Sequence, residues 1–286
     1  MEQKLAEVRH IKINEERPER NTVIPEMLSY LGALLLISGI GLIMYQRWDQ
    51  ITQSQRTATF SLLSIAFFVA GLLAGDTVDI RRRVSGFLYV LASGSAGGAV
   101  YVTFPSDLAP FRSLALAAIV ALFGYTIAQT ALGHLVLYGL TAGTLIALIY
   151  ENIDAEEIRL YTTMSVTVAL SLFWIVLAAT STVEKELGLS LGLWTFFLAS
   201  QWSFAQEYRS LSYSIALGMI ATCLWLYTKV PSWVLVTAGT IAFITSLTEF
   251  IFETMDGSLA AAIGLLVIGA ITVIAGVRTV SSRREN

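Results

Sequence analysis

The fold of this chain is decided by residues 111–150, which read FRSLALAAIVALFGYTIAQTALGHLVLYGLTAGTLIALIY. Arg112 is the only Asp, Glu, Lys or Arg in this stretch. One helix of that length would reach about 60 Å at about 1.5 Å per residue, twice the thickness of a hydrocarbon core of about 30 Å. The stretch therefore predicts two membrane-crossing helices that meet near Thr130 and Ala131.

The composition of the rest of the chain agrees with a place in a bilayer. Of 286 residues, 55% are hydrophobic and 14% are charged, and the mean hydropathy is +0.68. A soluble domain has about one-quarter charged residues. The 18 Lys and Arg against 21 Asp and Glu give no basic surface for nucleic acid, and a single cysteine, Cys223, excludes a disulfide scaffold.

Ten apolar stretches are long enough to cross a membrane as helices. They are residues 28–46, 57–75, 84–104, 111–129, 132–150, 159–180, 187–206, 211–229, 232–252 and 258–278. The expected fold class is therefore all-α, a polytopic integral membrane helix bundle. We expect a charged tail at 1–27, a single transmembrane domain at 28–278 and a basic tail at 279–286.

The distribution of Lys and Arg predicts the orientation of these helices. With ten spans, thirteen basic residues fall on the side of the two tails and five fall on the opposite side. Because cytoplasmic loops carry the excess of basic residues, both termini are expected in the cytoplasm. The five on the other side are Arg47, Arg56, Arg112, Arg159 and Arg209.

Several polar and aromatic residues mark the predicted helix ends. Thr52 and Gln55 fit a capping box, and Asp154 fits a helix N-cap. Tryptophans near span ends are typical of the membrane interface, where the indole N–H reaches the head groups. The predicted interfacial residues are Trp48, Asp49, Trp202, Trp225 and Trp233.

Three consecutive arginines, Arg81, Arg82 and Arg83, permit two interpretations. They fix the orientation of the neighbouring spans, or they also bind anionic lipid head groups. The bilayer is the expected partner in both cases, together with a second copy or another membrane protein, and no nucleic acid is expected.

The predicted span 84–104 has seven small residues in succession at its centre, Ser93 to Ala99. One interpretation is close helix packing, because small residues let backbones approach in a membrane. The other is a thinned helix beside a cavity at the bilayer midplane. The residues assigned to this packing or cavity site are Ser93, Gly94, Ser95, Gly97, Gly98, Gly139 and Gly143.

A second candidate site lies on the predicted span 232–252. Thr245, Glu249 and Glu253 are spaced by four residues and share one helix face. Carboxylates inside a membrane are costly, so this line predicts a cation or proton site, whereas the alternative is that Glu249 reaches the aqueous rim.

No arrangement typical of an enzyme occurs in the sequence. His10 and His134 have no Cys, Asp or Glu at metal-ligand spacing, and Cys223 has no visible activating neighbour. The motifs of zinc hydrolases, serine hydrolases and nucleotide-binding loops do not occur. We expect no catalytic residue, no cofactor and no metal.

The segment Tyr30 to Leu36, continuing through Ser38-Gly39-Ile40-Gly41 to Trp48-Asp49-Gln50-Ile51, resembles a bacterial membrane family. That family is catalogued as domain of unknown function 2157, and Ala70 to Gly75 fits the end of its second helix. Arg47 and Thr52 depart from its Asn and Pro. The resemblance covers residues 28–75 and implies a multi-pass protein of the bacterial cytoplasmic membrane, without an established activity.

Two functions remain open at this stage. The first is permease-like transport of a small neutral or amphiphilic molecule through a cavity beside Gly94 and Gly98. The second is a non-catalytic membrane subunit or scaffold that packs against partner membrane proteins.

Overall fold

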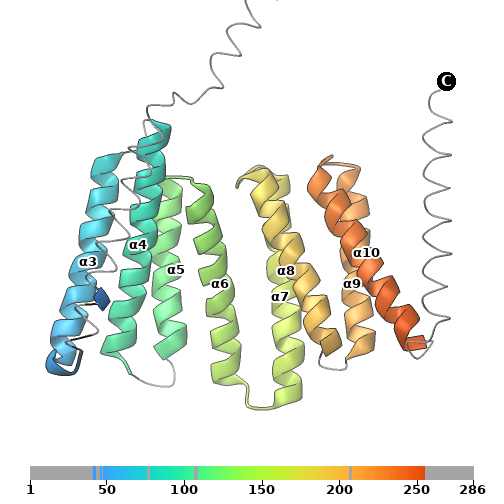
Figure 1. The fold of residues 1–286 in the computed structure, drawn as a ribbon, viewed down its shortest axis with the longest axis horizontal. Coiled ribbons are helices and arrows are strands. Elements are labelled where there is room, and N and C mark those ends of the chain that lie inside the picture. The colour runs from blue at the N-terminus through green and yellow to red at the C-terminus, as the bar shows by residue number, and fades with distance from the viewer. Residues whose placement is uncertain are drawn as a thin grey trace, which may run out of the picture. The chain divides into compact units, whose positions relative to one another are not determined.

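The structure is a computed structural model that describes residues 41–42, 46, 48–75, 78–105, 109–205 and 208–254. From Trp48 onward these residues form one short 3-10 helix and eight α-helices (Figure 1). The chain divides into two compact units, Met1–Thr130 and Ala131–Asn286. The boundary falls at the connection that the length of residues 111–150 requires.

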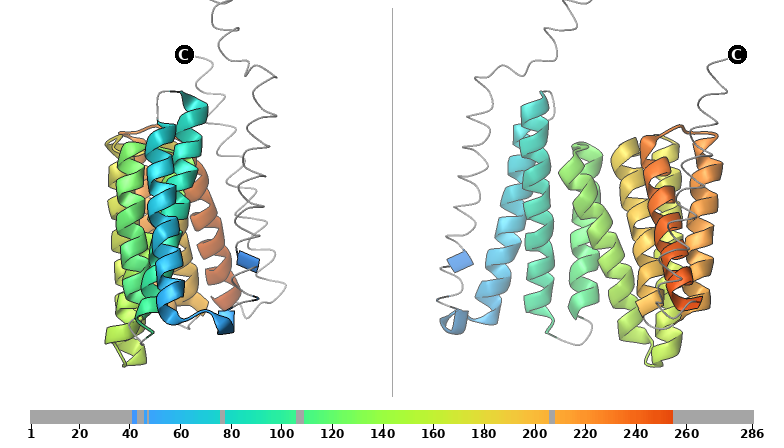
Figure 2. Two further views of the ribbon diagram at one scale, coloured as in Figure 1. Left: turned by 90° about the vertical axis from the view of Figure 1, so that its left-hand side faces the viewer. Right: turned by 45° about the vertical axis from the view of Figure 1, so that its right-hand side comes forward.

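Unit 1 contains η1 (Trp48–Gln50), α3 (Gln53–Ala74), α4 (Asp79–Thr103) and α5 (Ala109–Ile127). Helix α4 contacts both α3 and α5, and α3 and α4 run side by side (Figure 2). The Ser85 hydroxyl donates to the Gly71 carbonyl of α3 at 2.8 Å, and the Ser113 hydroxyl of α5 donates to the Gly97 carbonyl at 2.7 Å. At these two points a hydroxyl bonds directly to the backbone of a neighbouring helix, and the rings of Tyr89 and Phe60 lie against Gly71 and Gly98.

Unit 2 contains α6 (Ala131–Asn152), α7 (Glu156–Ala179), α8 (Lys185–Ala205), α9 (Arg209–Tyr227) and α10 (Trp233–Thr254). Helix α8 contacts all four of the others. A continuous apolar core joins α7, α8, α9 and α10 and includes Leu189, Leu193, Met219 and Leu235, each at most 1% exposed.

The eight predicted spans that fall in the described part of the chain are all α-helices, with ends within about five residues of those predicted. The spans predicted at 28–46 and 258–278 lie outside the described residues, apart from Gly41, Leu42 and Gln46, which are helical. The count of ten and the cytoplasmic termini stay predictions.

Seven of these helices are long and apolar enough to cross a membrane, and α8 is not among the seven. Its Gly, Ser and Gln residues lower its hydropathy. Eight of its residues are buried, including Gly192, Ser200 and Ser203, because α8 lies among other helices of unit 2.

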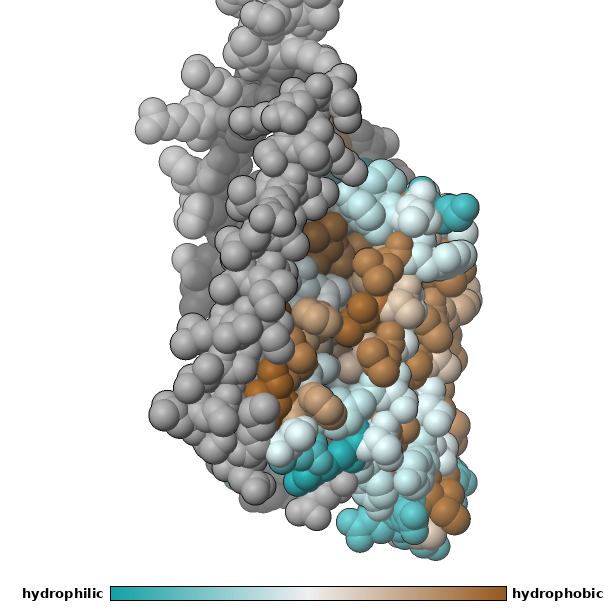
Figure 3. Space-filling view, turned by 90° about the vertical axis from the view of Figure 1, so that its right-hand side faces the viewer, coloured by the Kyte–Doolittle hydropathy of each residue, from teal (hydrophilic) through white to brown (hydrophobic). Residues whose placement is uncertain are grey.

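Large apolar side chains cover the outward faces of the helices. Leu62, Leu217 and Leu224 are 67%, 66% and 67% exposed. Figure 3 shows apolar side chains across the middle of one face, with polar side chains nearer the ends. Such a surface is stable against lipid tails and unfavourable in water, so the chain is a helical membrane protein.

The two predicted caps differ in outcome. Thr52 is the N-cap of α3 and forms the predicted capping box with Gln55, whose side chain accepts from the Thr52 amide at 2.9 Å. The Asp154 prediction is wrong, because the N-cap of α7 is Ala155 and no side chain caps it. Helix α7 starts one residue later than an Asp154 cap would need.

Candidate functional site

A polar pocket of about 290 Å³ lies at one end of unit 2. Its volume is at the small end of the range for ligand sites in proteins. We call it the rim pocket; it is lined by Tyr150, Glu156, Arg159, Leu160, Thr163, Trp202 and Tyr208.

Four helix ends place these residues around the rim pocket. Tyr150 lies in the last turn of α6, and Glu156 is the first residue of α7. Trp202 lies near the end of α8, and Tyr208 is the N-cap of α9. Because consecutive helices reverse direction, these four ends meet at one side of unit 2 (Figure 1).

The two charges of the rim pocket do not neutralise each other. Glu156 and Arg159 are three residues apart on α7, a spacing at which opposite charges on a helix commonly pair. Among the described residues, no ion pair within 4 Å joins them. The Arg159 guanidinium instead lies over the Tyr150 ring, 4.9 Å from its centroid.

Two aromatic side chains complete the polar wall. Trp202 is 54% exposed, and the Tyr208 ring packs edge-on against Tyr161 with 5.3 Å between centroids. Loss of solvation raises the pKa of the Tyr208 hydroxyl, and the negative charges of Glu157 and Glu156 raise it further. Tyr208 therefore keeps its proton at neutral pH and can donate a hydrogen bond.

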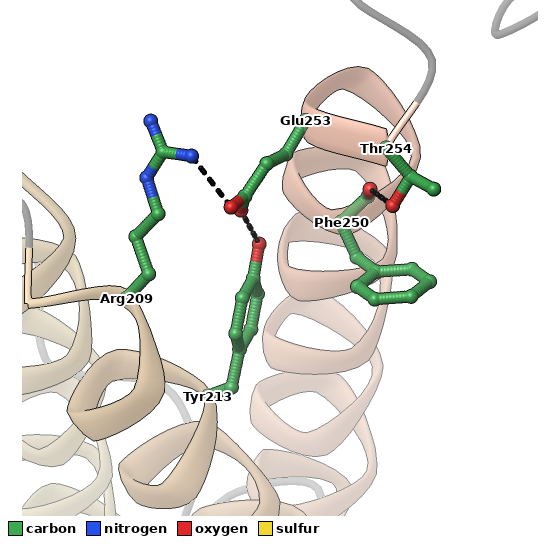
Figure 4. Close-up of polar contacts among 5 residues, drawn as sticks. All are labelled: Arg209, Tyr213, Phe250, Glu253 and Thr254. Atoms are coloured by element: carbon green, nitrogen blue, oxygen red, sulfur yellow. Dashed lines mark hydrogen bonds and ion pairs between the residues drawn. The ribbon is translucent and has the colours of Figure 1, made fainter.

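A charged cluster joins α9 and α10 at the same end of unit 2 (Figure 4). Arg209 pairs with Glu253 at 2.5 Å, and the Tyr213 hydroxyl donates to the second Glu253 oxygen at 2.8 Å. Figure 4 shows the Glu253 carboxylate between these two side chains. The Arg209 guanidinium therefore already pairs with Glu253, which is one of the three residues predicted to bind a cation.

The other two predicted members, Thr245 and Glu249, are half-buried on α10. The Glu249 Oε2 atom and the Gln201 Nε2 atom of α8 are both buried, and neither makes a hydrogen bond to a described atom. No group of three or more His, Cys, Asp or Glu that would suit a metal occurs within the described ranges. A cation or proton site at Thr245 and Glu249 stays a prediction.

The small-residue run in α4 lies at close helix contacts on two sides. A Cβ atom added to Gly97 would lie 3.1 Å from the Ser113 carbonyl oxygen of α5, and one added to Gly98 would lie 3.0 Å from the Phe60 ring of α3. Ser93 is buried, and its hydroxyl donates to the Val90 carbonyl at 2.8 Å. These contacts agree with the packing interpretation.

Other members of that predicted set have different surroundings. Added Cβ atoms at Gly94 and Gly139 would meet no described atom within 4 Å. Ser95 and Gly143 are half-buried. Gly139 and Gly143 belong to unit 2, whereas the run in α4 belongs to unit 1.

The buried histidine of unit 2 has a structural partner. His134 is fully buried, and its Nε2 atom accepts a hydrogen bond from Trp174 Nε1 at 2.7 Å. Tyr138 packs edge-on against Trp174 with 4.9 Å between ring centroids. This geometry agrees with a structural hydrogen bond for His134.

The predicted interfacial residues lie near helix ends. Trp48 is half-buried under the Arg56 guanidinium, and Asp49 belongs to the same short helix. Trp225 and Trp233 are 65% and 71% exposed.

The predicted lipid-binding arginines occupy the first turns of α4. Arg81, Arg82 and Arg83 are exposed, and Arg82 pairs with Asp79 at 2.8 Å. Lipid binding by the three arginines stays a prediction.

The rim pocket was missed from sequence, although it left a weak signal. The sequence singles out Arg159 only as one of the five basic residues on the side opposite the tails. An acid and a base within one turn, flanked by Tyr150 and Tyr161, is the pattern that points to this end of α7.

Comparison of the chain with known protein families, with curated proteins and with solved structures found no match. The resemblance of residues 28–75 to a bacterial membrane family therefore stays an expectation.

Proposed function

We propose that this membrane protein binds a small polar or amphiphilic molecule in the rim pocket, as the recognition step of permease-like transport. The observation that supports the proposal is a pocket of about 290 Å³ at four helix ends, with one acid, one base and three aromatic side chains in its wall. Ligand sites combine apolar surface with a few convergent polar groups in this way.

The predicted topology supports binding of solute from the side of the membrane opposite the cytoplasm. Arg159 and Arg209 are among the five basic residues predicted on the side opposite the cytoplasm. A pocket on that side would meet a solute before the solute enters the bundle. Sites between helices of membrane proteins commonly carry the polar groups that cargo needs.

The test is flux in liposomes that contain the purified full chain. Labelled glycerol, choline, glycine betaine and lysophosphatidylcholine represent neutral, cationic, zwitterionic and amphiphilic cargo. We expect entry of at least one of these above the rate of protein-free liposomes.

A pair of matched variants connects that flux to the rim pocket. Leu160→Trp fills the pocket, whereas Ile158→Trp adds the same bulk to an exposed position two residues earlier on α7. We expect Leu160→Trp to lower the flux by at least about fivefold and Ile158→Trp to preserve it, with both variants melting near the parent temperature. Absence of flux for all four probes, or equal flux in the two variants, would contradict the proposal.

A further inference from the structure

The rim pocket holds an acid and a base that line one cavity without pairing. Glu156 and Arg159 have Cβ atoms about 5–6 Å apart at this spacing on a helix. Glu156 is exposed and Arg159 is half-buried, and no ion pair between these two occurs in the described structure. The wall therefore presents two separate, opposite charges to whatever enters.

From this arrangement we infer that the ligand of the rim pocket is a small zwitterion, with an ammonium group and a carboxylate or phosphate group. The inference rests on the proposed binding role of the pocket. A ligand with one charge satisfies only one wall residue and leaves the other unmatched. A ligand that carries both an ammonium group and an anionic group satisfies both.

Each end of such a ligand has a partner of suitable chemistry. The guanidinium of Arg159 presents a planar set of N–H donors that suits carboxylate or phosphate oxygens. Arg159 lies over Tyr150, which holds its guanidinium at the wall. The Tyr208 hydroxyl is a further donor in the same wall, whereas the Thr163 hydroxyl already donates to the Arg159 carbonyl at 2.8 Å.

The ammonium end would meet Glu156 and two aromatic side chains. Trp202 and Tyr208 line the pocket, and the faces of such rings attract organic cations, quaternary ammonium groups in particular. The Tyr150 face is already covered by Arg159, so Trp202 and Tyr208 are the rings left for a ligand cation.

The experiment measures binding of three probes to the full chain in nanodiscs of phosphatidylglycerol, which has no ammonium group. The probes are phosphocholine, choline and inorganic phosphate. We expect phosphocholine to bind at least about tenfold more tightly than choline, which is only cationic, and than inorganic phosphate, which is only anionic. Equal affinity for phosphocholine and choline, or no binding of phosphocholine, would overturn the inference.

Charge-neutral variants give a crossed pattern. Glu156→Gln should weaken phosphocholine binding by at least about tenfold and preserve phosphate binding, whereas Arg159→Gln should weaken phosphocholine and preserve choline. Glu157→Gln, whose side chain lies beside the pocket rather than in its wall, should change affinity by less than about threefold. Uniform losses in all three variants would contradict specific charge matching.

Phosphatidylcholine in the bilayer carries the same ammonium and phosphate groups in its head group. If a lipid head group occupies the pocket, phosphocholine will bind more weakly in phosphatidylcholine nanodiscs than in phosphatidylglycerol nanodiscs. If the ligand is a free solute, the two affinities will be equal. Both outcomes support zwitterion recognition and identify its source.

Flux and binding separate the two proposals. Phosphocholine binding with the crossed pattern but without flux of any probe would refute transport and leave the ligand class standing. Flux that the Leu160→Trp variant abolishes, without preference for zwitterions, would refute the ligand class alone.

Discussion

Replacement of Gly124 by alanine tests whether close backbone contact holds unit 1 together. Gly124 lies in the last two turns of α5. A Cβ atom added there would lie 2.4 Å from the Cβ and 2.7 Å from the Cγ of Tyr89 on α4. Tyr89 is 2% exposed, and rotation of its side chain cannot move its own Cβ away.

The expected cost follows from these distances. Ordinary contact begins at 3.4 Å, so α4 and α5 must separate locally by about 1 Å, the difference between 3.4 and 2.4 Å. Overpacking of this kind costs about 1–3 kcal/mol. Alanine in place of glycine returns about 1 kcal/mol of helix propensity at most. We expect Gly124→Ala to lower the free energy of unfolding by up to about 2 kcal/mol.

Gly94→Ala in the same unit is the matched control. Its added Cβ would meet no described atom within 4 Å, so only the helix-propensity gain remains, up to about 1 kcal/mol of added stability. The assay is unfolding of the purified chain in mixed micelles with increasing SDS, followed by circular dichroism. If Gly124→Ala proved as stable as Gly94→Ala, the close approach of α4 and α5 at Tyr89 would be refuted.

Three further predictions address unit 2. Trp174→Phe removes the donor to buried His134 and should cost about 1–2 kcal/mol in the same unfolding assay; an unchanged midpoint would contradict the hydrogen bond. Arg209→Gln should cost less than about 1 kcal/mol, because the Arg209 and Glu253 side chains are 53% and 30% exposed; a larger loss would indicate a stronger coupling than a rim ion pair provides. In intact cells, the thiol of Glu157→Cys should react with a membrane-impermeant maleimide, whereas buried Cys223 should not. If the new thiol did not react from outside the cell, the predicted orientation in the membrane would be wrong.

The helices could be predicted from sequence because the bilayer imposes one strict condition on them. Every backbone amide in hydrocarbon must be satisfied within the chain, and a helix of about 20 apolar residues does this. Residues 111–150 show the strength of this condition, because their length alone predicts a break near Thr130. In the structure α5 ends at Ile127 and α6 begins at Ala131, and the two units divide after Thr130.

Helix α8 shows where the same rule weakens. Its buried face carries Gly188, Gly192, Ser200 and Ser203, which suit contact with neighbouring helices. Hydropathy measures affinity for lipid, so small and polar residues on a face that contacts other helices lower the hydropathy of α8, although its other face exposes Trp194 and Leu198. Its length and its flanking charges together still predict a span at 187–206.

Helix starts at the rim were less predictable than the spans. Thr52 caps α3 as its sequence indicated, whereas Asp154 does not cap α7. Both residues have suitable side chains. The difference lies in which residue begins the helix, and a shift of one position decides whether a side-chain oxygen can reach the free amides.

The rim pocket depends on packing that no local pattern encodes. Tyr150 and Tyr208 are far apart in sequence. They line one cavity because α6 and α8 end, and α7 and α9 begin, at the same side of unit 2. At a membrane surface, water and head groups can satisfy an acid or a base singly, so neither Glu156 nor Arg159 is unusual alone. Glu156 and Arg159 become informative together, because they line one cavity without pairing with each other. A ligand that carries one positive and one negative group would pair with both.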